Sequence, residues 1–496
     1  MTKLQKFEKI AAVLIIIATF IYIPLAIMHK GYMPLDDCNR DVAFSVTDKE
    51  WADVIVLEPG FNTDHNAGWH QILRFLNKRL NISKEGLIAF CVVSLFFILN
   101  VSGALTVPNS GSWLITLLIV FIAEPTMFGR MTSGRPFLVS CVSTLLVLRL
   151  WFIEPDKSLT AAETFVKYFL TLVLLSLGVW IHGSWYVFLI LPGAMLIAGR
   201  LGNAFSLTVL ILAATAIGSF MTGHFNEFLN YHFVATYNIY SEKVYNWQLV
   251  TENGEGNPGW FWIIPTAFLI MFLVSRKKIK LSSLASDPLF ILILLTWLPA
   301  IKVIRFWADW GRVAMMFWLC YRLSDIIEDM TLVKKTAVRW LLFVCLIAST
   351  VLIITRYPWS QEKERAKYSV DFTKSEFAPW APGKNGTIYN DNMFHFYYLF
   401  YNEPKADYRF ALGFESATMP REDKVVLREG TDGIRVVVGM ATCGIAAGAR
   451  PVLNAFVDGV AEAGLTDKVT VTQTGCIGIC QYEPVVEVFT KDADKV

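Results

Sequence analysis

The chain is 496 residues long, and 54% of its residues are hydrophobic while only 17% are charged, against about 25% charged in an ordinary soluble protein. This composition excludes a purely soluble, a disordered or a collagen-like protein. The net charge of +2 gives no basic field that would attract nucleic acid. Eight cysteines are too few for a disulfide-built scaffold. We expect small buried hydrophobic residues at the five cysteines in or near apolar segments: Cys38, Cys91, Cys141, Cys320 and Cys345.

The long apolar runs fall within residues 10–356 and predict an all-α polytopic membrane bundle. The first run, Ile10 to Met28, is about 19 residues long, whereas a signal peptide has a shorter core and a small-residue cleavage site. We therefore interpret it as a retained transmembrane helix. Ten further runs bring the predicted total to about eleven: residues 86–106, 112–128, 135–153, 165–181, 184–199, 203–221, 259–275, 288–304, 311–326 and 338–355.

The basic residues predict an orientation for these spans. With the N-terminus in the cytoplasm, the cluster Arg276 to Lys280 falls on the cytoplasmic side, as the positive-inside rule requires. An odd number of spans then places the C-terminus outside, and we expect an integral protein of the bacterial inner membrane. Two long loops, residues 29–85 and 222–258, lie on the outer side. The second is rich in aromatic residues, which favour the bilayer surface.

The first outer loop carries an acidic pair, Asp36 and Asp37, about eight residues after the first span. Two short helical stretches are predicted in the same loop, Asp48–Leu57 and Gly68–Leu80. The second has its apolar side chains on one face at helical spacing. It is therefore predicted to be an amphipathic helix at the membrane surface.

Further ionisable residues fall on the same predicted side of the membrane. Residues of this kind at membrane level are candidate functional residues, although long side chains at helix ends also extend to the interface without any such role. For Asp64 and His70, the simpler alternative is a polar contact that stabilises the loop. The candidates are Asp64, His70, Arg135, His182, Arg305, Asp309 and Arg312.

About eleven spans, a large first outer loop with interfacial helices and the acidic pair after span one resemble the GT-C superfamily of membrane glycosyltransferases. The resemblance covers residues 1–424 and includes an extracytoplasmic region, residues 357–424, with Gly386–Met393, Tyr398–Tyr401 and Leu412–Glu415. Members of this superfamily use polyprenyl-phosphate-linked sugars. The resemblance therefore implies transfer of a sugar from such a donor at the outer face of the membrane.

The same resemblance implies roles for the candidate residues. Asp36 or Asp37 would be the base that takes the proton of the acceptor hydroxyl, and the other would hold a divalent metal or the acceptor. The guanidinium groups of Arg135, Arg305 and Arg312 would bind the donor phosphate. His182 would donate to the leaving phosphate or simply end a helix. No acceptor-binding signature identifies the acceptor.

The last 72 residues, 425–496, have a different pattern, typical of a compact α/β domain. The predicted strands are Ile434–Met440, Lys468–Thr474 and Pro484–Thr490, and the predicted helix is Ala449–Gly464. The run of valines in the first strand is typical of a buried strand, and Gly464 suits a helix C-terminus.

Two loops of this segment carry cysteines, Cys443 in the first and Cys476 and Cys480 in the second. These loops resemble those of thioredoxin-like [2Fe-2S] ferredoxins, which occur with NADP-reducing hydrogenases and respiratory complex I. The three cysteines match ligand positions of that family. The chain has Gly448 where a fourth cysteine would stand, while a [2Fe-2S] cluster normally takes four thiolates. A cluster with a non-cysteine ligand, zinc, a Cys476–Cys480 disulfide and a folded domain without any cofactor are the alternatives.

Three interpretations of the whole chain follow. The first is the glycosyltransferase, with membrane lipid and a polyprenyl-phosphate sugar as partners. The second is a membrane-anchored [2Fe-2S] electron-transfer protein with a redox partner. The third is a transporter. Transporters often have internal repeats and a polar site near the midplane of the membrane, and the sequence shows neither, which argues against this interpretation. Ferredoxin domains of this type work in the cytosol, so an outer C-terminus conflicts with the second resemblance. Either the span count is off by one, or the fusion is unusual, or two sequences have been joined.

Overall fold

The computed structural model describes most of the chain. The described residues are 17, 19–58, 60–107, 110–153, 158–183, 185–241, 263–276, 280–328, 340, 344, 348, 351, 370, 372, 377–378, 381–390, 393–413, 420, 434–440, 442–465, 469–474 and 484–489. The chain divides into two compact units. The first comprises Met1–Ile388 and Asn392–Thr418, and the second comprises Tyr389–Asp391 and Met419–Val496.

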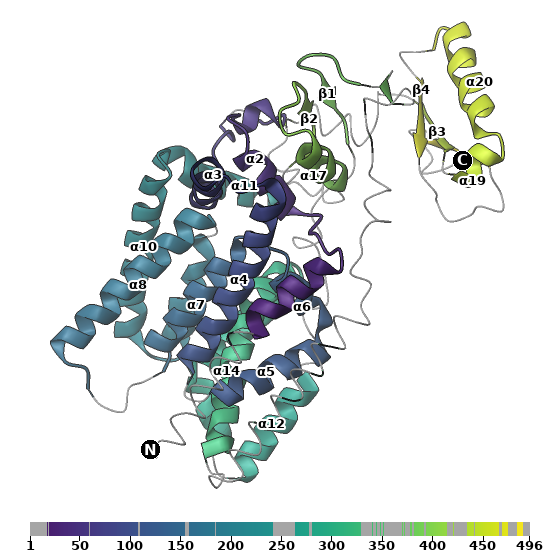
Figure 1. The fold of residues 1–496 in the computed structure, drawn as a ribbon. Coiled ribbons are helices and arrows are strands. Elements are labelled where there is room, and N and C mark those ends of the chain that lie inside the picture. The colour runs from purple at the N-terminus through teal and green to yellow at the C-terminus, as the bar shows by residue number, and fades with distance from the viewer. Residues whose placement is uncertain are drawn as a thin grey trace. The chain divides into compact units, whose positions relative to one another are not determined.

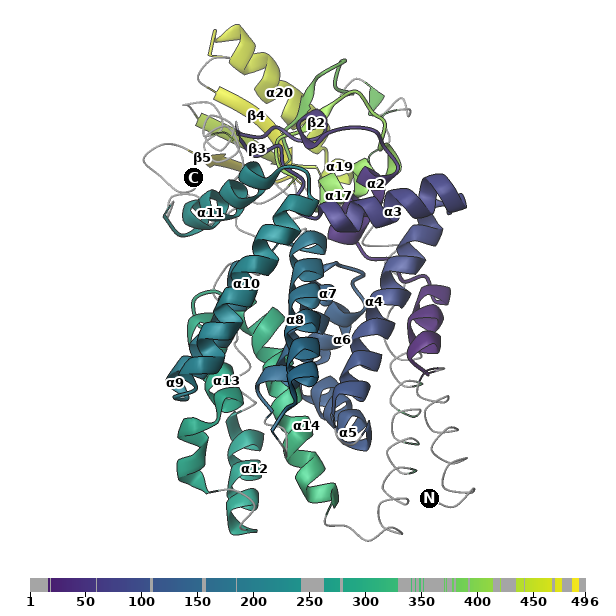
Figure 2. The same ribbon diagram turned by 90° about the vertical axis from the view of Figure 1, so that its left-hand side faces the viewer.

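The first unit is a helical bundle, which confirms the predicted class (Figure 1). Its described residues include three helices long and apolar enough to cross a membrane: α4 (Lys84–Thr106), α8 (Ala161–Ile181) and α10 (Leu201–Met221). These helices indicate that the protein is associated with a membrane. Helix α7 (Phe137–Trp151) lies between α4 and α8, and α10 packs on α8 (Figure 2).

The prediction of about eleven spans is not reproduced by the described residues, because several apolar runs form shorter helices. Glu124 and Pro125 divide the third run into α5 (Ser110–Ala123) and α6 (Pro125–Met131), since proline cannot donate a helical hydrogen bond. The sixth run forms a 3₁₀ turn, η2 (Trp185–Leu189), and the eight-residue α9 (Ile190–Ile197).

Of the remaining runs, residues 311–326 form α14 at about the predicted length, and the others are shortened or only partly described. The other described helices of this part are Thr19–His29, α11 (Phe225–Ser241), α12 (Ile263–Ser275), η6 (Leu281–Ser286), α13 (Pro288–Ala300) and α14 (Arg312–Glu328). Of the last predicted span, residues 338–355, only isolated positions are described, and Cys345 is not among them.

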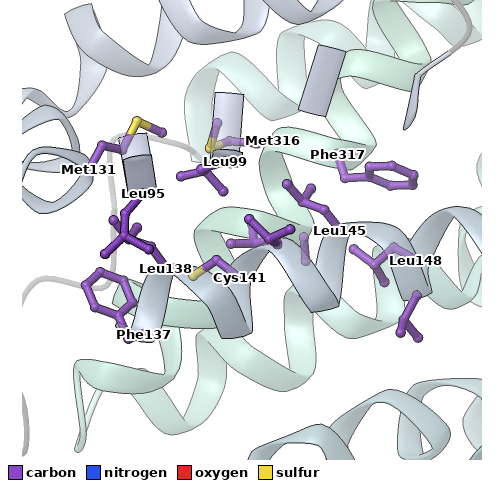
Figure 3. Packing of buried hydrophobic residues seen from close by; sticks show 14 of the residues in the cluster. Leu95, Leu99, Met131, Phe137, Leu138, Cys141, Leu145, Leu148, Met316 and Phe317 are labelled. Atoms are coloured by element: carbon purple, nitrogen blue, oxygen red, sulfur yellow. The ribbon is translucent and has the colours of Figure 1, made fainter. Parts of the chain in front are cut away.

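The core of the bundle is formed by close packing of apolar side chains from α4, α7 and α14. Figure 3 shows Leu95 and Leu99 directed toward Leu138 and Cys141, with Met316 beside them. Helices approach closely where a residue is small, as membrane helices do in the absence of a hydrophobic force between them. One such residue is Gly103, where a Cβ atom would lie 2.1 Å from the Trp113 ring. The described free cysteines Cys38, Cys91, Cys141 and Cys320 are all buried, as expected of small hydrophobic residues.

A compact group of short elements covers one end of the bundle. From the first loop it contains α2 (Asp37–Ser45), η1 (Trp51–Asp53) and α3 (Ala67–Leu80), and from the later segment β1 (Thr387–Ile388), α17 (Met393–Asn402) and β2 (Arg409–Phe410). The apolar faces of α2, η1, α17 and β2 form a shared core that includes Phe44, Trp51, Phe396 and Phe410. We call this group the cap.

The two helices predicted in the first loop have different outcomes. The prediction of a helix over Gly68–Leu80 is confirmed by α3, which begins one residue earlier, at Ala67. The prediction of Asp48–Leu57 is wrong, because only the single turn η1 forms there. The chain after this turn is extended. The Val56 amide donates to the Phe410 carbonyl (2.9 Å) and the Phe410 amide donates to the Val54 carbonyl (2.9 Å).

The second unit contains a three-stranded sheet in the order β4 (Val469–Thr474), β3 (Ile434–Gly439), β5 (Val486–Phe489). Strand β3 is parallel to β4 and antiparallel to β5. A short helix, α19 (Thr442–Ala446), precedes α20 (Ala449–Glu462), which packs its apolar face on the sheet around Val436 and Val438. The predicted strands and helix are therefore confirmed, within a few residues at each end.

Candidate functional site

The acidic pair of the first loop divides into two roles at the start of α2. The Asp36 carboxylate accepts from the backbone N–H of Cys38 at 3.1 Å, so Asp36 is the N-cap of the helix. A side chain at this position satisfies a backbone donor that the first helical turn leaves unpaired. Asp37 is the first residue of the helix, and its carboxylate is held by other residues of the cap and the bundle.

Three segments that are distant in the sequence meet at the Asp37 carboxylate. Arg40, one turn later in α2, lies 2.9 Å from Oδ1, and Arg135, from the turn before α7, pairs with Oδ2. The Tyr397 hydroxyl in α17 donates to Oδ1 at 2.9 Å. Burial, and then the neighbouring carboxylate of Asp37, raise the pKa of Tyr397 well above its ordinary value of 10, which keeps the hydroxyl protonated as a donor.

Behind Asp37 lies a buried chain of ion pairs. Both Nε and Nη2 of Arg40 donate to Asp41 Oδ1 at 3.0 Å, and His70 Nε2 lies 3.3 Å from the same oxygen. On its other side, His70 Nδ1 lies 2.8 Å from both oxygens of Asp64. The side chains of Asp41 and His70 are fully buried. The chain Asp64–His70–Asp41–Arg40 therefore fixes the guanidinium that orients Asp37.

The histidine of this chain is charged near neutral pH. Burial disfavours the charge, but the carboxylates of Asp64 and Asp41 outweigh it and raise the pKa of His70 to about 9. For Asp64, burial raises the pKa, but His70 and His65 outweigh it and lower the value to about 2. His65 is neutral, because burial and then the charge of Arg40 lower its pKa to about 4.

A second group of ionic side chains adjoins Asp37 through Arg135. Asp309 pairs with Arg130 and, at 3.4 Å, with Arg305. The guanidinium carbon of Arg130 lies 4.6 Å from the centroid of the Phe137 ring, and that of Arg135 lies 5.6 Å from the same centroid. Two guanidinium groups are therefore attracted to one aromatic ring.

The exposure of these side chains distinguishes accessible charges from structural ones. Arg130 and Arg135 are each 17% exposed and Arg305 is 21% exposed, whereas Asp309 is 2% exposed. Asp309 belongs to η7 (Phe306–Gly311), a π-helical turn, and such turns occur frequently at functional sites. The buried carboxylate anchors two guanidinium groups that still reach solvent.

His182 also lies at this end of the bundle. It ends α8, and its Nδ1 is 3.2 Å from the Ser140 hydroxyl oxygen. Its ring centroid is 6.5 Å from that of Phe137. Burial, and then the positive charge of Arg305, lower the pKa of His182 well below 6.5. A neutral imidazole can donate one hydrogen bond and accept another, and it adds no positive charge to the site.

The structure separates Arg312 from the other predicted residues. Its guanidinium pairs with Glu124, and both side chains are less than 10% exposed. An ion pair this buried is a structural link between α14 and the break between α5 and α6. The expected role of Arg312 in phosphate binding stays a prediction, and the burial of its guanidinium group does not favour that role.

Sequence reasoning missed several residues of the cluster. Arg40 follows Asp37 by three positions and was therefore detectable as a helical neighbour. Arg130 follows the broken third run, and the predicted boundary of that span concealed it. No signal in the sequence connects Tyr397 with the site, because its partner Asp37 is 360 residues away.

The described residues offer no group of three or more histidine, cysteine or acidic side chains arranged to hold a metal ion. The predicted cluster ligands Cys443, Cys476 and Cys480 lie outside what can be described, since the Cys443 side chain and residues 475–483 are not among the described parts. At Asp36 and Asp37, the two guanidinium groups against Asp37 would repel a divalent cation. The metal expected there does not fit these neighbours.

Comparison with known proteins gives one partial similarity. No protein-family model matches the chain. Over 84 residues the chain is 34% identical to the NADP-reducing hydrogenase subunit HndB of Solidesulfovibrio fructosivorans. The match covers 17% of this chain and 66% of that subunit, just under two thirds of its length.

Proposed function

We propose that the helical unit is a membrane glycosyltransferase that takes a sugar from a polyprenyl-phosphate donor at the end of the bundle covered by the cap. The observation that carries the proposal is the group of partly exposed guanidinium side chains there. Arg130, Arg135 and Arg305 reach solvent beside two carboxylates, Asp37 and Asp309. Three guanidinium groups this close together produce a positive potential that attracts an anionic ligand.

The chemistry of a phosphate-linked donor matches this arrangement. A guanidinium group binds phosphate oxygens in pairs, with better geometry than an ammonium group. Arg305 and Arg130 are anchored by the buried Asp309 carboxylate, so binding costs little further side-chain ordering. In the proposal, the apolar bundle accommodates the lipid chain, and the remaining apolar runs complete the eleven predicted spans with the N-terminus in the cytoplasm.

Asp37 is the proposed base for the acceptor hydroxyl. Its Oδ1 is held by Arg40 and Tyr397, and its Oδ2 is held by Arg135. A donor phosphate would compete with Asp37 for Arg135. Binding of the donor would thus release Oδ2 to accept the hydroxyl proton, while Oδ1 stays fixed by the buried chain behind it.

The test compares Asp37→Asn with Asp36→Asn in the purified full-length protein, supplied with polyprenyl-phosphate sugars. We expect D37N to lose about 10²- to 10⁴-fold in turnover, the usual contribution of a general base. D36N keeps a good helix N-cap and should stay near the wild-type rate. Equal rates for D37N and wild type, with both folded by thermal unfolding, would contradict the role of Asp37.

Donor binding is tested separately with a polyprenyl phosphate that carries no sugar. Arg135→Gln and Arg305→Gln should weaken its retention, because each removes an accessible cation of the cluster. Arg322→Gln is the matched control, since Arg322 is 23% exposed and pairs with Asp287 away from this site. Equal retention by all three variants would contradict the phosphate site.

A second function concerns the other unit, whose cysteine-bearing loops resemble those of [2Fe-2S] ferredoxins, and the similarity of 84 residues of the chain to the hydrogenase subunit supports it. We propose that this unit carries electrons through a [2Fe-2S] cluster bound by Cys443, Cys476 and Cys480, with a fourth ligand that is not cysteine. Iron analysis and a visible spectrum of protein purified without oxygen test this. About two irons per chain are expected, with loss on Cys476→Ser. An iron-free, colourless protein would overturn the proposal.

A further inference from the structure

A cavity at the other end of α8 is independent of the proposed transferase site. It has a volume of about 490 Å³ and lies between the end of α7 and the start of α8. Its walls are mainly apolar, with Leu150, Ile153 and Val166 among them, and it also contains Arg149 and Lys167. The volume is in the range of small-molecule sites.

The position of the cavity corresponds to the opposite surface of the membrane. Helix α8 has 21 residues and is therefore about 30 Å long, close to the thickness of the bilayer core. His182 ends the helix at the cap, and Thr160 caps its start beside the cavity. In the predicted orientation, the end of α8 beside the cavity lies in the cytoplasmic leaflet, where anionic lipids attract basic side chains.

The two cations of the cavity are available for an anion. Among the described residues, neither Arg149 nor Lys167 forms an ion pair with a carboxylate. Lys167 Nζ lies 3.9 Å from the centroid of the Trp151 ring, and that ring is fixed because its indole N–H donates to Thr171 at 2.8 Å. The ammonium group is thus held in place by a cation–π contact rather than neutralised.

The acidic residue of the cavity is directed to another partner. Glu163 accepts from the backbone N–H and the hydroxyl of Thr160, both at 2.8 Å, and so closes the capping box of α8. Among the described residues that line the cavity, two cations against this one carboxylate leave a positive balance. Outside the cavity, α8 continues with exposed apolar side chains suited to acyl chains, including Phe165, Phe169 and Val173.

We propose that this cavity binds an anionic phospholipid, with its phosphate on Arg149 and Lys167 and its acyl chains along α8. The charge balance, the level of the cavity in the membrane and the apolar face that leads away from it all match such a lipid. A zwitterionic phospholipid has the same chains but carries a compensating cation. It should therefore be retained less well.

Native mass spectrometry of the full-length protein tests the proposal, with phosphatidylglycerol and phosphatidylcholine of identical acyl chains as probes. Arg149→Gln with Lys167→Gln should lower the retention of phosphatidylglycerol by about tenfold or more and leave phosphatidylcholine unchanged. The control is Arg276→Gln with Lys280→Gln. It removes two charges from the same predicted side, including an arginine over an aromatic ring.

The outcomes separate a local site from diffuse attraction. Equal losses in the two double variants, or no loss in R149Q/K167Q, would overturn the proposal. If that variant fails to fold, Ala162→Phe provides a second test, because it fills the cavity and keeps both cations. Retention of phosphatidylglycerol by A162F at the wild-type level would equally overturn the site.

Discussion

Replacing His70 by glutamine tests the buried ionic chain behind Asp37. The imidazolium lies between Asp41, which is fully buried, and Asp64, which is 22% exposed. Glutamine removes the positive charge and leaves the Asp41 carboxylate with Arg40 as its described cation. Breaking a buried ion pair typically costs about 3–5 kcal/mol of folding free energy. We therefore expect the apparent Tm of H70Q to fall by on the order of 5 °C.

The pH dependence of stability provides a second, independent test of the His70 ion pairs. The pKa of His70 rises from 6.5 to about 9 on folding, so its stabilisation is fully present below pH 6.5 and is lost as the pH rises through 9. This shift corresponds to roughly 3 kcal/mol. Wild-type protein should lose stability between pH 7 and 10, and H70Q should lose less. His65, with a pKa of about 4, is neutral throughout this window.

Thermal unfolding in one zwitterionic detergent between pH 6 and 10 measures both effects. His224→Gln is the matched control, because His224 is 67% exposed and its pair with Glu227 at 3.2 Å is a surface contact. Such pairs contribute about 0–1 kcal/mol. A wild-type Tm for H70Q, or parallel pH profiles for H70Q and wild type, would refute the ionic chain as a stabilising feature.

Two further substitutions test the packing of the bundle. Arg312→Gln should lower the Tm by several degrees, because it removes the guanidinium group that pairs with the buried Glu124 carboxylate, and adding Glu124→Gln should restore part of the loss. No recovery in the double variant would contradict this. Gly103→Ala should cost about 1–3 kcal/mol in unfolding experiments, because its Cβ atom would overlap the Trp113 ring. Gly202→Ala, with open space around it, should be neutral or slightly stabilising. A neutral G103A would contradict the close approach.

The sequence predicted the elements whose cause is local. The length of the apolar runs was sufficient for α4, α8 and α10, and the helical spacing of apolar residues was sufficient for α3. Two predictions about local structure differ from the structure: one because of a contact distant in the sequence, the other because of a local signal within an apolar run. The chain after η1 is extended because Ile55 pairs with Phe410 of β2, more than 350 residues later. The sequence Glu124–Pro125 is a local signal for the end of α5, but it lies within an apolar run, which favoured one continuous span.

The candidate site was predictable by residue type more than by partner. Asp37, Arg135, Arg305 and Asp309 are ionisable residues that the sequence predicts at the membrane surface, and the structure places them in two adjoining groups of ion pairs. The members that complete those groups depend on the fold. Tyr397 reaches Asp37 only because α17 packs on α2.

The arrangement of charges predicts that stability and ligand binding respond to different substitutions. His70 and Asp41 are buried, so their replacement acts on the folded state. The side chains of Arg135 and Arg305 are 17% and 21% exposed, and each can exchange its carboxylate partner for the anion of a ligand. R305Q should therefore lose polyprenyl phosphate while its Tm changes little, and H70Q should show the larger loss of Tm. If R305Q unfolded as easily as H70Q, the exposed and buried parts would form one structural network, and the phosphate site would lose its basis.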